Sequence, residues 1–308
     1  SQELKERMVR AVLAEPRREL TPGGAALNSM RVAAWVSGPS LRVAFLGSVG
    51  RDDQAKILVR AMEAVGVRPL LMEVDEATGV CGSLVETSSR DRCLGCIRGA
   101  AGAMNLDFLT TPAVSTAIQE ASVLYATSFV LSTPPRARCV HHLAKEAEAR
   151  HSTFALNLAS AGLLPKVYSE VLQLLPRCRF IFGNEGELKA FASLRGWSPD
   201  TGAGSGGATS SGSLTLARRL AELLRPGGTV VITAGSDATF VAPQGEEPYT
   251  VTVPAVRREE VVDTNGCGDA FVGGFLSQAA KDATLPHCVE EGHRCAGLVL
   301  RRRGCSLD

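Results

Sequence analysis

Apolar residues recur along this chain with two spacings, one typical of helices and one of buried strands. Residues 2–14 place Leu4, Met8 and Val12 at helical intervals among charged residues, which predicts an amphipathic helix before Pro16. Continuous apolar runs predict buried strands in LRVAFLGSVG, ASVLYATSFV, TFALNLAS, RFIFGNEGEL and TVVITAG. Helices are predicted in TPGGAALNSMRVAAWV, DDQAKILVRAMEAVG, residues 136–150 and residues 165–175. This alternation indicates an α/β fold with a mostly parallel central sheet flanked by helices.

The pattern changes between Thr78 and Arg98. Two short alternating runs, TGVCGSLVET and RDRCLGCIRG, are joined there by a polar turn, which predicts a β-hairpin rather than a βαβ unit. We therefore expect one large α/β domain formed by residues 1–76 and 102–308, with residues 77–101 as a small β excursion from it.

A second irregular stretch, residues 197–213, is rich in glycine and serine. Such a composition buries too little apolar area to order itself, so it predicts a mobile surface loop. A phosphate-binding loop is the alternative, but the stretch lacks the Lys-Ser/Thr ending and the strand-to-helix setting of that motif.

Composition narrows the partners and the compartment. The chain has 33 Lys and Arg against 32 Asp and Glu, a formal net charge of +1, so we expect no attraction to nucleic acid or to an anionic membrane. No apolar run approaches the roughly 20 residues of a membrane span, and the first residues are too charged for a signal peptide. The nine scattered cysteines suit reduced thiols better than a disulfide framework. These features predict a soluble, cytoplasmic protein.

One pair of cysteines, Cys93 and Cys96, has the spacing of a CxxC motif. A structural zinc site requires a second pair of ligands at compatible spacing, and the neighbouring sequence supplies none. We therefore expect no zinc site at this pair.

The segment VVDTNGCGDAFVGGFLSQAA combines features that suit phosphate chemistry. A strand-like run meets a glycine turn and then an apolar helix. Gly266 and Gly268 flank Cys267, so backbone N–H groups can converge at a helix N-terminus and stabilise negative charge. Asp269 follows at the start of the helix, where it can accept a proton from an attacking hydroxyl. The alternative is that Asp269 is an ordinary first-turn carboxylate stabilised by the helix dipole, and that Gly266 and Gly268 only shape a tight connection.

The run DTNGCGDAFVGGF is similar to the signature of the ribokinase-like carbohydrate kinase family, whose usual form has alanine where this chain has Cys267. The resemblance implies a ribokinase-like α/β fold with a small β lid, to which residues 77–101 contribute. It also implies that Asp269 is the catalytic base and that the amides of Gly266, Cys267 and Gly268 form an anion hole. The substitution keeps a small side chain, and backbone groups form the hole, so we expect it to be tolerated.

Two further segments resemble the adenosine kinase branch of this family. TPGGAALNSMRVA is similar to its substrate-binding stretch, which implies that Gly23, Gly24 and Asn28 line a ribose pocket. Taken alone, those residues describe an ordinary helix entry. The segment Asp91 to Leu94 resembles a lid in which an arginine reaches the transferring phosphate, which implies that Arg92 neutralises transition-state charge. Taken alone, Arg92 is a solvated hairpin arginine.

The nucleotide site is implied by three other likenesses. Asn184 and Glu187 match an Asn-x-x-Glu motif that influences Mg²⁺ and phosphate binding, with Glu187 acting on the metal through water. Thr233 and Gly235 match a nucleotide-binding turn at the end of a strand. His293 stands where the family often has asparagine beside the adenine of ATP. The residues alone favour a capped helix start at NEGEL and a plain strand-end turn.

The implied reaction is transfer of the ATP γ-phosphoryl group to the 5′-hydroxyl of adenosine, a step of purine salvage that gives AMP and ADP. Mg²⁺ is the implied cofactor, adenosine and ATP are the implied small-molecule partners, and we expect a monomer. A related sugar or nucleoside kinase and a catalytically weakened nucleoside-binding protein are the alternatives. The last is motivated by His293 and by the family's opening Gly-Asn-x-Leu-Asp strand, which has no counterpart in this sequence. We therefore expect a truncated product or a divergent copy with altered substrate affinity.

Overall fold

The computed structural model describes residues 2–85, 92–198 and 208–307. The strands are β1 Val43–Gly50, β2 Val67–Val74, β3 Val80–Val85, β4 Arg92–Ile97, β5 Val123–Thr127, β6 Thr153–Asn157, β7 Phe180–Asn184, β8 Thr229–Thr233, β9 Ala238–Pro243 and β10 Tyr249–Thr252. The α-helices are α1 Gln2–Ala14, α2 Ala25–Ser37, α3 Asp53–Glu63, α4 Leu106–Leu109, α5 Pro112–Glu120, α6 Pro134–Ala149, α7 Leu164–Leu174, α8 Glu185–Leu194, α9 Ala208–Ala221, α10 Cys267–Ala279 and α11 Leu285–Leu300.

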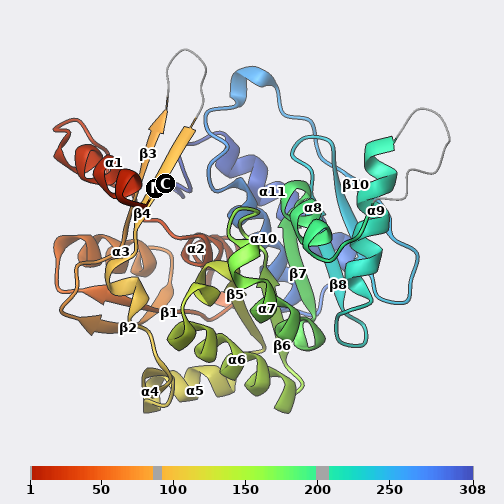
Figure 1. The fold of residues 1–308 in the computed structure, drawn as a ribbon, viewed down its shortest axis with the longest axis horizontal. Helices are drawn as coiled ribbons and strands as arrows, with labels where there is room; N and C mark the ends of the chain where they lie inside the picture. Colours follow the sequence, from red (N-terminus) through yellow and green to blue (C-terminus); the bar gives the residue numbers. More distant parts are fainter. Residues whose placement is uncertain (1, 86–91, 199–207, 308) are drawn as a thin grey trace.

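The central sheet is mostly parallel, as the alternating pattern predicts. In the described part of the chain it has six strands in the order β10-β9-β8-β7-β6-β5, and β5 to β8 run parallel to one another. β9 and β10 are antiparallel additions at one edge, and β1 pairs with β2 as a separate parallel ribbon. Figure 1 shows the helices on both sides of this sheet.

β7 shows how helices cover both faces. Its successive side chains point to opposite faces. Ile181 joins the large buried cluster formed with α6, α7 and α8, whereas Phe180 and Phe182 join a second cluster with α10. The rings of Phe180 and Phe182 each lie 5.0 Å from the ring of Phe275. Burial on both faces explains why this strand reads as a continuous apolar run.

The predicted hairpin is confirmed. β3 and β4 pair antiparallel from Val80 opposite Ile97 onwards, and they project from the body beside α1 (Figure 1). α1 packs against the hairpin at Gly82, where a Cβ atom would lie 3.4 Å from the Cα of Val9. This contact buries Val9 of α1, whereas Leu4 near the start of the helix is exposed.

The expectation of reduced cysteines is wrong for Cys81 and Cys96, which form a disulfide. The hairpin register places the two residues directly opposite each other, with 4.1 Å between their Cα atoms. Sequence spacing does not reveal which residues of two strands face each other, so the pair could not be predicted from the pattern.

Two other local predictions are wrong. Residues 261–264 are not a strand: the side chains of Val261 and Val262 are exposed, and the backbone N–H of Val262 donates to the carbonyl of Leu300 in a loop. Part of the predicted loop 197–213 is helical, since α9 begins at Ala208. The helix is held in place by buried apolar residues farther along it, Leu216, Ala217 and Leu220. Residues 199–207 of that predicted loop lie outside the described residues.

Among the described residues, no helix is both long enough and apolar enough to cross a membrane.

Candidate active site

The site is organised by the N-terminus of α10. Gly266 is its N-cap residue and has a left-handed backbone with φ of 78°, a conformation that glycine adopts without strain. A Cβ atom at this position would also lie 2.9 Å from the Cβ of Cys305, so no larger residue fits. The glycine turn therefore places Gly268 and Asp269 in the first turn of the helix, where the helix dipole favours negative charge. The amide of Cys267, the first residue of the helix, donates to the carbonyl of Thr264 at 3.4 Å.

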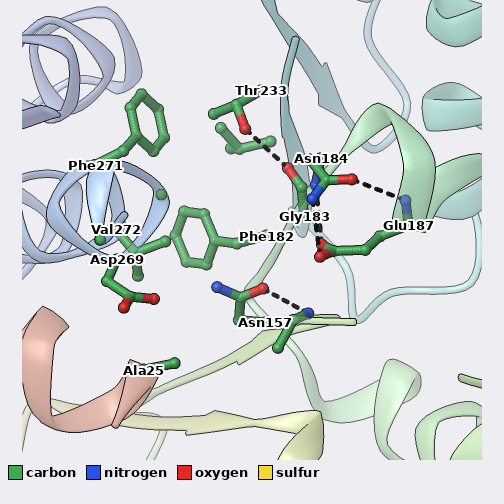
Figure 2. A pocket seen from close by; sticks show the side chains of 14 residues that line it. Ala25, Asn157, Phe182, Gly183, Asn184, Glu187, Thr233, Asp269, Phe271 and Val272 are labelled. Carbon is green, nitrogen blue, oxygen red and sulfur yellow. Dashed lines mark hydrogen bonds between the residues drawn. The ribbon is translucent and has the colours of Figure 1, made fainter. Parts of the chain in front are cut away.

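This N-terminus opens into a pocket at the carboxyl ends of the parallel strands, where open α/β sheets generally bind ligands. The polar side chains that line it are those of Asn157, Asn184, Glu187, Thr233 and Asp269. Figure 2 shows that they come from the ends of β6, β7 and β8, from the start of α8 and from α10, and that Asp269 and Asn157 face the same space. Gly266 and Gly268 also line the pocket.

Asp269 is the acidic group nearest the helix N-terminus. Burial raises its pKa to about 6, the negative charge of Glu187 acts in the same direction, and a hydrogen bond from Asn28 opposes both. The Nδ2 group of Asn28 donates to Oδ2 of Asp269 at 2.9 Å. A carboxylate with this pKa is ionised at neutral pH and is a stronger base than an ordinary aspartate, as general base catalysis requires.

Asn28 reaches Asp269 because α2 packs tightly on α10. A Cβ atom on Gly273 of α10 would lie 2.4 Å from the carbonyl oxygen of Ser29 and 2.8 Å from the Cβ of Val32. Only glycine permits this close approach of the two helices. The second polar atom of the Asn28 amide, Oδ1, is buried without a hydrogen-bond partner. It can therefore accept a hydrogen bond from a ligand hydroxyl.

The other two residues predicted for substrate binding lie just before α2. Gly24 is the N-cap residue of that helix, and a Cβ atom on Gly23 would have no neighbour within 4 Å. Neither residue lines the pocket, although the next residue, Ala25, does.

Asn184 and Glu187 form a reciprocal capping box at the start of α8. The amide of Glu187 donates to Oδ1 of Asn184 at 2.9 Å, and the Asn184 backbone N–H donates to the Glu187 carboxylate at 3.0 Å. Glu187 is buried, and this burial raises its pKa despite the two hydrogen bonds from Asn184. Its carboxylate nevertheless lines the pocket, so capping and a role toward a ligand are compatible.

The residues predicted to bind nucleotide are not all in this pocket. Thr233 lines it at the end of β8 and donates a hydrogen bond to the carbonyl of Gly183. Gly235 follows in a turn with φ of 63° and does not line the pocket. His293 lies on α11, buried against Thr239 with 2.9 Å between Nε2 and Oγ1, and burial lowers its pKa. It too lies outside the pocket lining.

Arg92 begins β4, and its side chain is outside the described part of the structure, as is Asp91. No group of three or more His, Cys, Asp or Glu side chains within the described ranges could hold a metal ion. Glu187 and Asp269 are the acidic side chains of the pocket, so they suit a Mg²⁺ ion that keeps its waters and is held mainly by phosphate oxygens.

One polar residue that lines the pocket, Asn157, was not predicted. Asn157 ends β6 with its side chain in the pocket, and its Nδ2 group donates to the hydroxyl of Tyr125 at 3.3 Å. Burial and the charge of Asp269 raise the pKa of Tyr125. The available signal was a polar residue at the carboxyl end of the apolar run TFALN, which is where parallel strands present ligand-binding groups.

Comparison with known proteins identifies the relatives of this chain. Residues 3–308 match the pfkB family carbohydrate kinase. The chain is 31% identical to adenosine kinase 2 of Arabidopsis thaliana over 294 residues, which cover 94% of this chain and 80% of the plant protein. It is 33% identical to the adenosine kinase of Schizosaccharomyces pombe over 297 residues, or 95% of this chain and 83% of the yeast protein.

A solved structure gives the same result. The crystal structure of Anopheles gambiae adenosine kinase in complex with P1,P4-di(adenosine-5) tetraphosphate superposes with a TM-score of 0.88 and 28% sequence identity. The match covers 99% of this chain and 87% of the mosquito protein. The ribokinase-like α/β fold is therefore confirmed.

Proposed function

Because this chain belongs to the pfkB family of carbohydrate kinases, which transfer phosphoryl groups to alcohols, we propose that it is an adenosine kinase. Its reaction is the transfer of the ATP γ-phosphoryl group to the 5′-hydroxyl of adenosine, which gives AMP and ADP and serves purine salvage. The observation that carries the proposal is Asp269, a carboxylate of raised pKa at a helix N-terminus that faces the pocket. Relatives from plants, yeast and insects that bear this name support the choice of acceptor.

Asp269 acts as the general base. Its ionised carboxylate accepts the proton of the 5′-hydroxyl as that oxygen bonds to the γ-phosphorus and the bond from phosphorus to the ADP oxygen breaks. The amides of Gly266 and Gly268 stabilise the negative charge on the transferring group. The amide of Cys267 donates to the carbonyl of Thr264 at 3.4 Å, so it joins them only by exchanging that long hydrogen bond for one to a phosphate oxygen. Because the transition state of phosphoryl transfer is loose, alignment and charge stabilisation provide most of the catalysis.

The nucleotide is assigned to the β7 and β8 end of the sheet, with Asn184, Glu187 and Thr233 beside its phosphates. Two further residues proposed to bind the nucleotide lie outside the pocket lining. Gly235 is in the turn after β8, and His293 is assigned to the adenine. When bound, Mg²⁺ would neutralise part of the phosphate charge. Glu187 would orient the waters of that ion, since both of its oxygens already accept hydrogen bonds from Asn184.

The acceptor is assigned to the α2 side, where Gly23, Gly24 and Asn28 contact the ribose. Residues 77–101 act as part of a lid, from which Arg92 reaches the transferring phosphate and helps to exclude water. The proposed form is a cytoplasmic monomer, and size-exclusion chromatography with light scattering would test its oligomeric state.

ATP turnover with adenosine tests the proposal. We would follow AMP and ADP formation by chromatography with Mg²⁺ present, and then replace adenosine with ribose, fructose, inosine and guanosine. Adenosine should support turnover at least about tenfold faster than any of these acceptors, which corresponds to about 1.4 kcal/mol of transition-state discrimination. A sugar or another nucleoside as the best acceptor would reject adenosine as the substrate and retain the kinase. Adenosine binding without turnover would indicate a nucleoside-binding protein.

A further inference from the structure

A second cationic centre lies outside the pocket, at the start of α6. Arg136 occupies the third position of this 16-residue helix, and its side chain is buried, with 8% exposure. Burial of a guanidinium group is costly unless hydrogen bonds and a counter-charge compensate for the lost water. Arg136 therefore requires acceptors.

The described part of the chain provides none of them. No hydrogen bond, ion pair or ring contact to the Arg136 side chain exists among the described residues. The comparison with Arg31 is informative, because Arg31 is buried to a similar extent and donates to the carbonyls of Ala61 and Cys305. This fold can thus satisfy a buried arginine with its own backbone, and it does not do so at Arg136.

The surroundings of Arg136 are cationic and polar. Burial lowers its pKa to about 10, and the like charge of Arg98 contributes in the same direction, so the two guanidinium groups are close enough to repel. No carboxylate is among the charged groups that shift this pKa. The hydroxyl of Thr133, the N-cap residue of α6, is also buried and has no hydrogen-bond partner. Two donor groups on the first turn of α6, those of Arg136 and Thr133, therefore lack protein acceptors, whereas the side chain of Arg98 is exposed. The nitrogen atoms of Arg136 are not among the fully buried unpaired atoms, so a ligand from solvent can reach them.

The backbone brings these groups to the edge of the sheet that carries the pocket. α6 follows the carboxyl end of β5 through a short 3-10 helix, Ser128–Ser132, and Arg98 follows the end of β4. The hydroxyl of Ser128 donates to the carbonyl of Leu158, which lies between the pocket residues Asn157 and Ala159. The cationic centre is therefore a neighbour of the proposed acceptor site.

We propose that Arg136, Arg98 and Thr133 bind a small oxyanion, the phosphate group of a ligand or free inorganic phosphate. The planar guanidinium of Arg136 donates two parallel hydrogen bonds to the anion, Thr133 donates a third, and Arg98 supplies a second positive charge at the open side. Such a ligand supplies the counter-charge that buried Arg136 lacks. The assignment does not depend on which alcohol the kinase phosphorylates.

The test compares Arg136→Gln with Arg138→Gln, a matched control on the same helix whose arginine is exposed. Phosphate binding would be measured by calorimetry and by thermal unfolding, at constant ionic strength and without ATP. We expect Arg136→Gln to weaken phosphate binding by about tenfold to a hundredfold, as loss of charge-assisted hydrogen bonds does, and Arg138→Gln to leave it unchanged. Arg98→Gln should have an intermediate effect.

Stability without phosphate separates this site from a structural arginine. In phosphate-free buffer Arg136→Gln should melt at the same temperature as the parent chain or higher, because it removes an uncompensated buried charge. An equal loss of stability with and without phosphate would overturn the proposal, and so would binding of both inorganic phosphate and AMP that is identical in the two variants.

A parallel measurement with AMP and adenosine identifies the source of the phosphate. Dependence on Arg136 for AMP but not for adenosine or inorganic phosphate would assign the site to a nucleotide phosphate. Dependence for inorganic phosphate would assign it to the free anion. Neither measurement involves turnover, so a failure of the proposed kinase activity would leave this result interpretable.

Discussion

At the scale of single residues, the pKa of Asp269 sets a testable pH dependence. The carboxyl must be ionised to accept a proton, and burial raises its pKa to about 6. We expect kcat/KM to rise with pH through about 6 and to level off above about 7. Asp269→Asn should lower kcat by about 10²–10⁴-fold and remove this rise. Initial rates between pH 5 and 8 would check both, and an unchanged acid limb in the variant would exclude Asp269 as the titrating base.

The same substitution should raise stability. Because the folded-state pKa of Asp269 is above its unfolded value, folding favours the protonated form, and stability falls as the pH rises between those two values. Asp269→Asn keeps the shape and the hydrogen bond from Asn28 without this cost. At pH 7.5 we expect the variant to be more stable by about 1–3 kcal/mol, from about 1.4 kcal/mol per pKa unit. Chemical denaturation at pH 7.5 and at pH 4 would test this, since the gain should nearly vanish at pH 4.

Asn28 gives a second prediction at this scale. Its Nδ2 group stabilises the ionised form of Asp269, so Asn28→Leu, which has a similar shape and no donor, should raise the pKa of Asp269. We expect the acid limb of kcat/KM to move to higher pH and adenosine to bind more weakly. A higher KM for adenosine with an unchanged acid limb of kcat/KM would show that Asn28 contacts only the substrate. Sequence separation explains why this bond was not predicted, since the partners are 241 positions apart in the chain.

At the scale of elements, close packing of α2 on α10 holds the side-chain amide of Asn28 against the carboxylate of Asp269. Gly273→Ala would place a methyl group 2.4 Å from a backbone carbonyl, which neither helix can avoid without moving. We expect a loss of about 2–3 kcal/mol in unfolding free energy and a fall in kcat. Gly297→Ala on α11 is the control, because its methyl group would meet only Arg301 at 3.6 Å and should add up to about 1 kcal/mol. Equal stability of the two variants would refute the packing argument.

The elements also show where sequence patterns succeed and fail. Continuous apolar runs predicted β5, β6, β7 and β8, because both faces of these strands are buried. β9 and β10 were not predicted, and residues 261–264 were wrongly read as a strand, because edge strands and loops near an active site take their form from tertiary contacts. α9 was not predicted, and its first turn falls within the predicted loop because buried residues farther along the helix stabilise this Gly/Ser-rich turn.

At the scale of the whole molecule, the family signature at α10 indicated where the site lies. The pattern of apolar and polar residues could not show which distant segments meet there. Asp269, Glu187 and Thr233 meet in one pocket, as ends of parallel strands and starts of helices do. Asn157 and the unpaired Arg136 became visible only through burial and hydrogen bonding. The Cys81–Cys96 pair likewise became visible only in the structure, because it depends on strand register in a hairpin that packs against α1.

The disulfide predicts a response to reductant. It closes a separation of 15 residues, and such a cross-link stabilises a domain by about 3 kcal/mol when the bridged segment unfolds with the rest. We expect reductant to lower the midpoint of thermal unfolding by several degrees and to add two titratable thiols in denaturant. The double variant Cys81→Ser, Cys96→Ser should melt where the reduced parent chain melts and should not respond to reductant. If reductant exposes two thiols without changing the melting temperature, the hairpin unfolds independently of the sheet, and the core does not depend on it.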